Sequence, residues 1–322
     1  MYFPYLYGRR SELLALRAIV PEFDIRETVV PIFEPVKADS GDLRRGMRAL
    51  GEAEVKTIIV TNPAQGEFKA SRGNPAASVP TWRASIGAEF SEFPSNIPGF
   101  LCRPEIRIAD ITAFLNRYPD REVALIYWSP RLTNAELRSL VAERRIQFHV
   151  NLHDSLSADQ RRILPTRKAV DITDRFNSQI RNADYGEPEF FSDKHLTFQA
   201  DSIGFGDFSV IGSTFSAGGG PAHAVAIHAV YKDPAAGTLW VEHFISDDTD
   251  IEIGTTAEKF LQAARKLVRA AGRRRAEFGN NEALRGYSED VTANTSPGLM
   301  ANKRRQIHHH VAANHLILTG AL

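Results

Sequence analysis

The sequence predicts an α/β fold of the (β/α)8, TIM-barrel-like type, with a β-hairpin and insertions in the C-terminal third. Six short apolar runs lie in the first 175 residues, and most are separated by segments with helical periodicity. This strand–helix–strand rhythm favours a parallel sheet with helical crossovers. A chain of 322 residues is long enough to form a barrel as one domain. Because the last third departs from the rhythm, a mixed open α/β sheet is the alternative.

The expected strands are short and rich in β-branched and aromatic residues. They cover Thr28–Val36, Val55–Thr61, Phe100–Arg103, Val123–Trp128, Gln147–Leu152 and Lys168–Thr173. Helical periodicity predicts helices at Ser11–Val20, Asp42–Leu50, Thr81–Phe90 and Ile108–Arg117. Capping boxes that begin at Thr133 and Ser157 predict two more helices.

The chain is expected to form a single domain over residues 1–322, although its character changes after residue 175. Residues 175–202 lack clear periodicity and are interpreted as an insertion. Residues 203–250 contain three β-rich runs and are expected to close the sheet, with the turn Asp233–Gly237 joining the last two runs as a hairpin. Helices are expected after the capping box at Thr255 and in the C-terminal segment 282–322.

The composition is that of a soluble globular protein with no electrostatic bias. Lys+Arg and Asp+Glu are both 39, so the formal net charge is zero, whereas a duplex-DNA binder usually carries a basic excess. The single cysteine, Cys102, excludes an intramolecular disulfide and fits a reducing compartment. The sequence contains no signal-peptide pattern and no apolar stretch of membrane-spanning length. A cytoplasmic location without membrane association is therefore predicted.

Polar residues that follow the predicted strands are the candidate site, because ligands of parallel α/β folds bind at the carboxyl ends of the strands. The predicted catalytic residues are His243, Asp247, Asp154 and Glu34. The predicted substrate-binding residues are Lys37, Asn62, Arg103 and Arg175. A histidine and carboxylates at strand ends are suited to general acid–base chemistry. The structural alternative is that such residues cap the helices that follow.

No metal site is predicted, and no cofactor is indicated. His223 and His228 are an odd number of residues apart, so on one strand they would face opposite sides. The glycine segments 204–206 and 218–220 are interpreted as tight turns, because neither fits a dinucleotide or phosphate-loop pattern. The basic clusters 273–275 and 303–305 are interpreted as solvated helix ends, with nucleic-acid binding as the alternative.

Several stretches together resemble the phage beta-protein family and its uncharacterised bacterial relatives. They are MYFPYLYGRRSELLALR at the N-terminus, VVPIFEPVK, the block GFGDFSVIG…GGGPAHAVAIHAVY, and PGLMANKRRQIHHH near the C-terminus. The resemblance implies a role in phage–host conflict, together with a partner protein encoded nearby. It implies no reaction, cofactor or catalytic residue.

Three functions are consistent with these observations. The first is a hydrolase or phosphodiester-directed enzyme with its site at the strand ends. The second is a non-enzymatic component of a defence or phage-interaction complex. The third, a nucleic-acid sensor, rests on the two basic clusters.

Overall fold

The computed structural model describes residues 1–216 and 223–322, which form two compact units. The barrel unit consists of Met1–Leu13, Ile25–Asp174 and Thr197–Phe208. The hairpin unit consists of the described parts of Leu14–Asp24, Arg175–Leu196 and Ser209–Leu322. This division differs from the single domain expected from the sequence. Its physical basis is that the predicted hairpin builds a second sheet with a core of its own.

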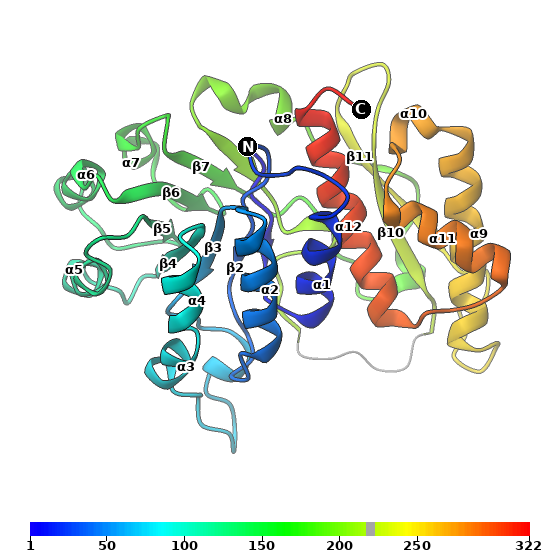
Figure 1. Ribbon diagram of the computed structural model, residues 1–322. Coiled ribbons are helices and arrows are strands. Elements are labelled where there is room, and N and C mark those ends of the chain that lie inside the picture. Colours follow the sequence, from blue (N-terminus) through cyan, green and yellow to red (C-terminus); the bar gives the residue numbers. More distant parts are fainter. Residues whose placement is uncertain (217–222) are drawn as a thin grey trace. The chain divides into compact units, whose positions relative to one another are not determined.

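The barrel unit confirms the predicted (β/α)8-type fold (Figure 1). Its eight strands are parallel and follow chain order in a nearly closed barrel. They are β1 (Tyr5–Leu6), β2 (Ile32–Phe33), β3 (Thr57–Val60), β4 (Asn96–Cys102), β5 (Val123–Tyr127), β6 (Ile146–Leu152), β7 (Ala169–Ile172) and β9 (Gly204–Gly206). The sequence did not predict β1, because its two residues lie in an aromatic stretch without strand periodicity.

Helices connect the barrel strands, as the rhythm of the sequence predicted. They are α2 (Gly41–Glu52), α3 (Val79–Ser85), α4 (Gly87–Glu92), α5 (Ile108–Arg117), α6 (Asn134–Ala142) and α7 (Ala158–Ile163), while α1 (Arg10–Ile19) spans the boundary between the units. The predicted capping boxes are confirmed: Thr133 accepts a hydrogen bond from the backbone N–H of Glu136, and Ser157 accepts one from Gln160. Each box satisfies backbone donors that would otherwise be unpaired at the start of a helix.

Close contact between the first and last strands completes the barrel. The backbone N–H of Phe3 donates to the Phe205 carbonyl at 2.8 Å, and that of Tyr5 donates to the Asp207 carbonyl at 2.9 Å. Gly206 allows this approach, because a Cβ at that position would lie 2.0 Å from the Phe3 carbonyl oxygen. The buried Tyr2 hydroxyl also donates to Asp207 at 2.7 Å. Residues 204–206, which were expected to form a tight turn, instead form strand β9, and their glycines are required by strand packing.

The hairpin unit contains an antiparallel sheet in the order β10 (Ala226–Lys232), β11 (Leu239–Ile245) and β8 (Glu189–Ser192). Its helices are α9 (Thr256–Arg273), α10 (Arg275–Phe278), α11 (Glu282–Ala293) and α12 (Leu299–Leu318), and the short α8 (Lys194–Thr197) lies at the unit boundary. The β10–β11 hairpin and the capping box at Thr255 are confirmed. Phe244, Phe260 and Tyr287 belong to a buried apolar cluster shared by the sheet and helices.

One expectation about residues 203–250 is corrected by this topology. Only β9 joins the parallel sheet, whereas β10 and β11 pair with each other and with β8. An antiparallel hairpin with its own apolar face packs on its own helices, so it does not extend a parallel barrel. The predicted turn at residues 218–220 lies outside the described residues. Among residues 1–216 and 223–322, no helix combines the length and apolarity needed to cross a membrane.

Candidate functional site

The side chains at the carboxyl ends of the barrel strands form the candidate site. Along each strand, alternate side chains face outward to the helices and inward to the barrel. Cys102, Tyr127 and Ala169 belong to the apolar cluster that packs on the helices, so they face outward. The residues next to them along each strand therefore face inward. The registers between strands then direct one set of rim residues inward: Glu34, Asn62, Arg103, Trp128, Asp174 and Phe208. We call this rim the barrel mouth.

Glu34 is a buried carboxyl group at the barrel mouth. It is 2% exposed, accepts a hydrogen bond from the Tyr5 hydroxyl at 2.8 Å, and accepts another from the backbone N–H of Ala64 at 3.3 Å. Burial raises the pKa of Glu34, although these hydrogen bonds and the nearby charge of Arg103 oppose the increase. A buried carboxyl with a raised pKa at a strand end is suited to donate a proton.

Arg103 follows β4 and supplies positive charge beside Glu34. Its Nε lies 2.7 Å from a carboxylate oxygen of Glu105, which is largely exposed. Its Nη1 is buried and has no hydrogen-bond partner within residues 1–216 and 223–322. A buried guanidinium nitrogen without a partner is unfavourable unless a ligand completes its hydrogen bonds. The planar guanidinium is suited to a carboxylate or phosphate.

His153 reaches the barrel mouth through an unusual backbone conformation. Strict alternation along β6 would place it on the outer face with Asn151, whose amide donates to Asp171 at 3.0 Å. Instead His153 has φ 58° and its ring stacks on Phe208, with centroids 4.9 Å apart and an interplanar angle of 12°. Asp154 and Ser129 also have positive φ. Positive φ is uncommon for residues other than glycine, and such strain is frequent at functional sites.

Tyr7 links the two sides of the barrel mouth electrostatically. Burial raises its pKa, and the nearby carboxylates of Glu34, Glu12 and Asp174 raise it further, while Arg9 lowers it. Burial lowers the pKa of His153, against the opposing effects of Asp174 and Asp154. The neutral forms of Tyr7 and His153 are therefore favoured at the mouth, close to several carboxylates.

The predicted residues of the barrel unit differ in their roles. Glu34 and Arg103 lie close enough for the charge of Arg103 to act on the pKa of Glu34. Asn62 bridges neighbouring strands, because its side chain bonds both the N–H and the carbonyl of Leu101 at 2.8 and 2.9 Å. Lys37 is 69% exposed and pairs with Glu67 at 3.2 Å. Asp154 is exposed on the rim. Four other residues at the mouth were not predicted from the sequence, because aromatic residues near strand ends also suit a core: Tyr5, Tyr7, His153 and Phe208.

The predicted residues His243, Asp247 and Arg175 belong to the hairpin unit. Their expected place at the end of a barrel strand is corrected, because β11 is an antiparallel strand and His243 lies within it. Asp247 pairs with Lys266 at 2.7 Å, whereas the ring nitrogens of His243 contact His228 and Glu189. Arg175 is partly buried, and its Nε has no hydrogen-bond partner within the described residues.

His243 instead belongs to a chain of three ionisable side chains. His228 lies directly opposite it across the hairpin, and their Nδ1 atoms are 2.8 Å apart. The Nε2 atom of His243 lies 3.1 Å from Glu189. The ring of Tyr185 covers both histidines, with centroid distances of 4.4 and 4.6 Å. The spacing of His223 and His228 along the chain does not reveal this pair, because it arises from the register of the hairpin.

The three side chains form a linear hydrogen-bonded chain. Glu189 accepts from His243 Nε2–H when ionised, so a neutral His243 presents an unprotonated Nδ1 to the Nδ1–H of His228. His243 uses both ring nitrogens in this chain, so the three groups do not converge on one point. The described residues contain no cluster of three or more His, Cys, Asp or Glu suited to a metal ion.

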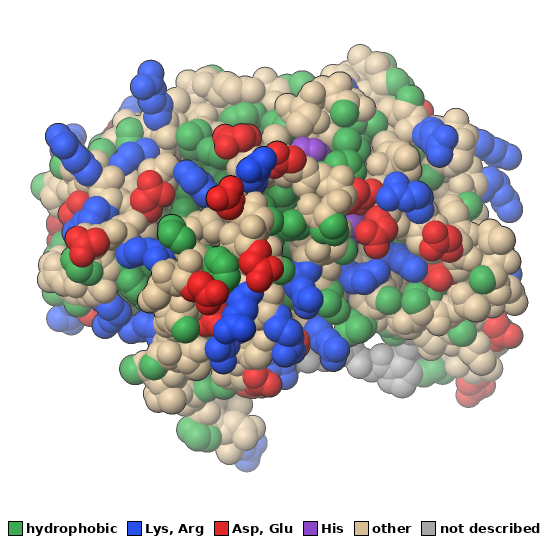
Figure 2. All heavy atoms as spheres, in the orientation of Figure 1, with side chains coloured by type: hydrophobic (Ala, Val, Ile, Leu, Met, Phe, Trp, Pro, Cys, Tyr) green, Lys and Arg blue, Asp and Glu red, His purple; other side chains and the backbone are tan. Residues whose placement is uncertain are grey.

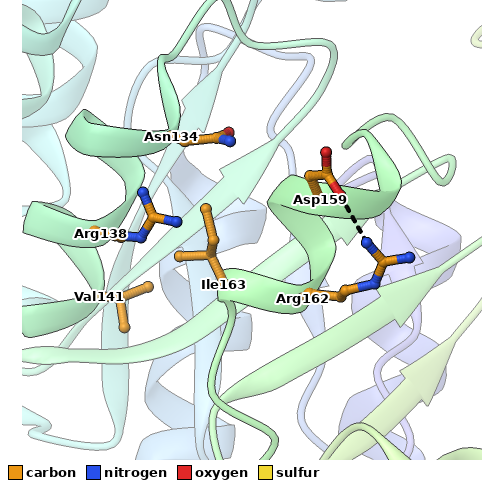
Figure 3. A pocket seen from close by; sticks show the side chains of 6 residues that line it. All are labelled: Asn134, Arg138, Val141, Asp159, Arg162 and Ile163. Atoms are coloured by element: carbon orange, nitrogen blue, oxygen red, sulfur yellow. Dashed lines mark hydrogen bonds and ion pairs between the residues drawn. The ribbon is translucent and has the colours of Figure 1, made fainter.

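A hollow of ≈ 560 Å³ lies between α6 and α7 of the barrel unit (Figure 3). It is lined by Asn134, Arg138, Val141, Asp159, Arg162 and Ile163. Arg162 is turned toward Asp159 of its own helix, and the two form an exposed ion pair at 2.6 Å. Because this hollow is open and its acidic residue is already paired, it lacks the buried, perturbed groups of the barrel mouth.

The two basic clusters are partly neutralised within the hairpin unit. Arg274 pairs with Glu242 at 2.7 Å and lies over the Tyr231 ring, while Arg305 pairs with Asp290 and lies over the Tyr287 ring. On the face drawn in Figure 2, basic and acidic side chains are interspersed. Neither observation favours an extended basic surface of the kind that binds nucleic-acid backbones.

No protein-family model, no curated protein and no solved structure matches this chain.

Proposed function

We propose that the protein is a hydrolase of anionic esters, most simply phosphate esters, with its active site at the barrel mouth. The observation that carries this proposal is the buried Glu34–Tyr5 pair beside the unpartnered Nη1 of Arg103. The site brings together an anion-binding group and a proton donor at the strand ends, where catalytic residues of barrel enzymes are found.

The proposed reaction uses three side chains in separate roles. Arg103 binds the anionic oxygens of the ester and offsets the charge of the transition state. Neutral His153 accepts a proton from the attacking water, and protonated Glu34 donates a proton to the leaving oxygen. The phosphorus–oxygen bond to the leaving alcohol breaks as the bond to water forms. The opposite pKa shifts of Glu34 and His153 favour these protonation states.

The test compares three variants in the hydrolysis of p-nitrophenyl phosphate, bis(p-nitrophenyl) phosphate and p-nitrophenyl acetate. We expect the intact protein to hydrolyse at least one phosphate ester. Glu34→Gln should lower kcat, by less than the roughly 10²–10⁴-fold usual for a general acid because p-nitrophenolate leaves with little protonation. Arg103→Gln should raise KM for phosphate esters more than for the neutral acetate.

Glu89→Gln is the matched control, because Glu89 is also buried but lies on α4 and pairs with Arg44 and Arg48. It should reduce stability without the loss of kcat expected for Glu34→Gln. Unchanged activity in folded Glu34→Gln, or no hydrolysis of any ester by the intact protein, would contradict the proposal.

A second candidate function, as a component of a complex, has separate support. The exposed large apolar side chains of the described residues all belong to the hairpin unit: Ile180, Phe190, Leu196, Ile251, Ile253, Leu299 and Met300. Exposed apolar groups favour association with another protein. This agrees with the partner and the role in phage–host conflict that the family resemblance implies. Pull-down with a protein encoded nearby, repeated with Ile180→Asp and Phe190→Asp, tests this function.

A further inference from the structure

We propose that the barrel mouth selects substrates in which a planar ring accompanies the anionic group, as in a nucleotide. The inference rests on the proposed function, because it assigns the anion to Arg103. It adds a second recognition element, the ring of Trp128, to the same site.

The two recognition elements lie on neighbouring strands. Cys102 pairs with Tyr127 in the register of β4 and β5, so Arg103 and Trp128 are the next opposed positions. The backbone N–H of Trp128 donates to the Cys102 carbonyl at 2.9 Å, which maintains this pairing beyond β5. Neighbouring strands are about 4.8 Å apart, so an anion on Arg103 is within the length of one nucleotide from the indole.

Trp128 is one of the two aromatic side chains at the mouth that remain partly exposed. Tyr5, Tyr7 and Phe208 are buried and pack on one another, with ring centroids 5.0 to 6.4 Å apart. His153 is the other partly exposed ring, and it lies 6.2 Å from Trp128. A partly exposed indole beside an unpartnered guanidinium is suited to stack a flat ring while the guanidinium holds a phosphate.

The left-handed backbone of His153 supports this arrangement. It turns the imidazole from the outer face of β6 onto Phe208, which places a second ring beside the indole. An aliphatic phosphate would use Arg103 but would not stack on the partly exposed indole. The structure therefore favours a nucleotide-like ligand over a sugar phosphate or inorganic phosphate.

Isothermal titration calorimetry with AMP, ribose 5-phosphate and adenosine tests the inference. We expect AMP to bind about tenfold or more tightly than ribose 5-phosphate, the increase that one stacked base can supply. Trp128→Leu should remove this difference and leave the affinity for ribose 5-phosphate unchanged. Trp128→Phe should retain most of it, because the phenyl ring still stacks. Trp240→Leu, which changes a partly exposed tryptophan of the hairpin unit, is the matched control.

The outcomes separate this inference from the proposed function. Equal affinities for AMP and ribose 5-phosphate would overturn the role of the ring and leave the anion site intact. A preference for AMP that survives Trp128→Leu would overturn the assignment to Trp128. Failure of both phosphates to bind would overturn the anion site as well. A 5′-phosphorylated trinucleotide, titrated in parallel, shows whether the site prefers a free nucleotide or the end of a strand. Tighter binding of AMP or of the trinucleotide supports recognition of a phosphate together with a ring.

Discussion

The barrel unit and the hairpin unit gather ionisable side chains by different means. In the barrel unit, residues far apart in the sequence meet because parallel strands end at the same rim, as Glu34 and Arg103 do. In the hairpin unit, His228 and His243 meet because two antiparallel strands hold them in register. The barrel mouth combines carboxylates, arginines and aromatic rings, whereas the hairpin unit buries histidines. Ionisable groups of both signs thus meet at the strand ends of one unit, whereas buried histidines with lowered pKa values are concentrated in the other.

The largest expected difference between the two units is their loss of stability at low pH. In the hairpin unit, burial lowers the pKa of His195, His228, His243, His308, His309 and His315, whereas in the barrel unit it lowers only those of His149 and His153 among the described residues. Below the unfolded pKa of about 6.5, the unfolded chain binds protons that the folded chain does not. Stability should therefore fall as the pH decreases from about 6.5, and more steeply in the hairpin unit.

His309 gives the scale of this effect. Its pKa is lowered to about 4, and its Nε2 lies 2.8 Å from the Val230 carbonyl. This shift corresponds to about 3 kcal/mol of stability lost by about pH 4. Hydrogen exchange at pH 7 and pH 5 should show α12 and β10 losing protection before β4 to β6. Earlier loss of protection in the barrel strands would contradict this comparison. In the His309→Gln variant, stability should decrease less between pH 7 and pH 5 than it does in the intact protein.

The closure of the barrel provides the next largest effect. Gly206→Ala places a methyl group against the Phe3 backbone, where the available distance is only 2.0 Å. Because backbone cannot move aside as a side chain can, we expect a loss of about 3 kcal/mol or more. Chemical denaturation measures the loss in the free energy of unfolding, and hydrogen exchange shows whether protection is lost in β1 and β9. Gly87→Ala on α4 is the control, because a Cβ there meets nothing within 4 Å. Equal stability of the two variants would contradict the proposed closure.

The smallest effect is expected at the histidine chain. Glu189 raises the pKa of His243 against the larger lowering by burial, and the Glu189 side chain is partly exposed. Glu189→Gln should therefore lower the pKa of His243 further and cost about 1 kcal/mol or less. Nitrogen-15 NMR of the imidazoles should also show a changed tautomer balance at His243. An unchanged His243 spectrum would contradict the hydrogen-bonded chain, and Glu187→Gln is the neighbouring control.

The sequence predicted much of the barrel because local chemistry determines it. The helix at Ile108–Arg117 has the predicted bounds, and the boxes at Thr133, Ser157 and Thr255 start helices as expected, since these signals depend on residues three positions apart. Glu34 and Arg103 were predicted as site residues for a related reason, because they are polar residues directly after apolar strands. These features are encoded by neighbours in the chain.

Other features were decided by the tertiary structure. The division of residues 203–250 between two sheets depends on which surface buries each apolar face, and that choice involves residues far apart in the sequence. The inward turn of His153 results from a left-handed backbone conformation that strand periodicity excludes. The pairing of His243 with His228 and Glu189 depends on strand register. Local sequence thus determined the elements and part of the mouth, whereas long-range packing determined which ionisable groups meet, because burial and register arise only when the strands come together.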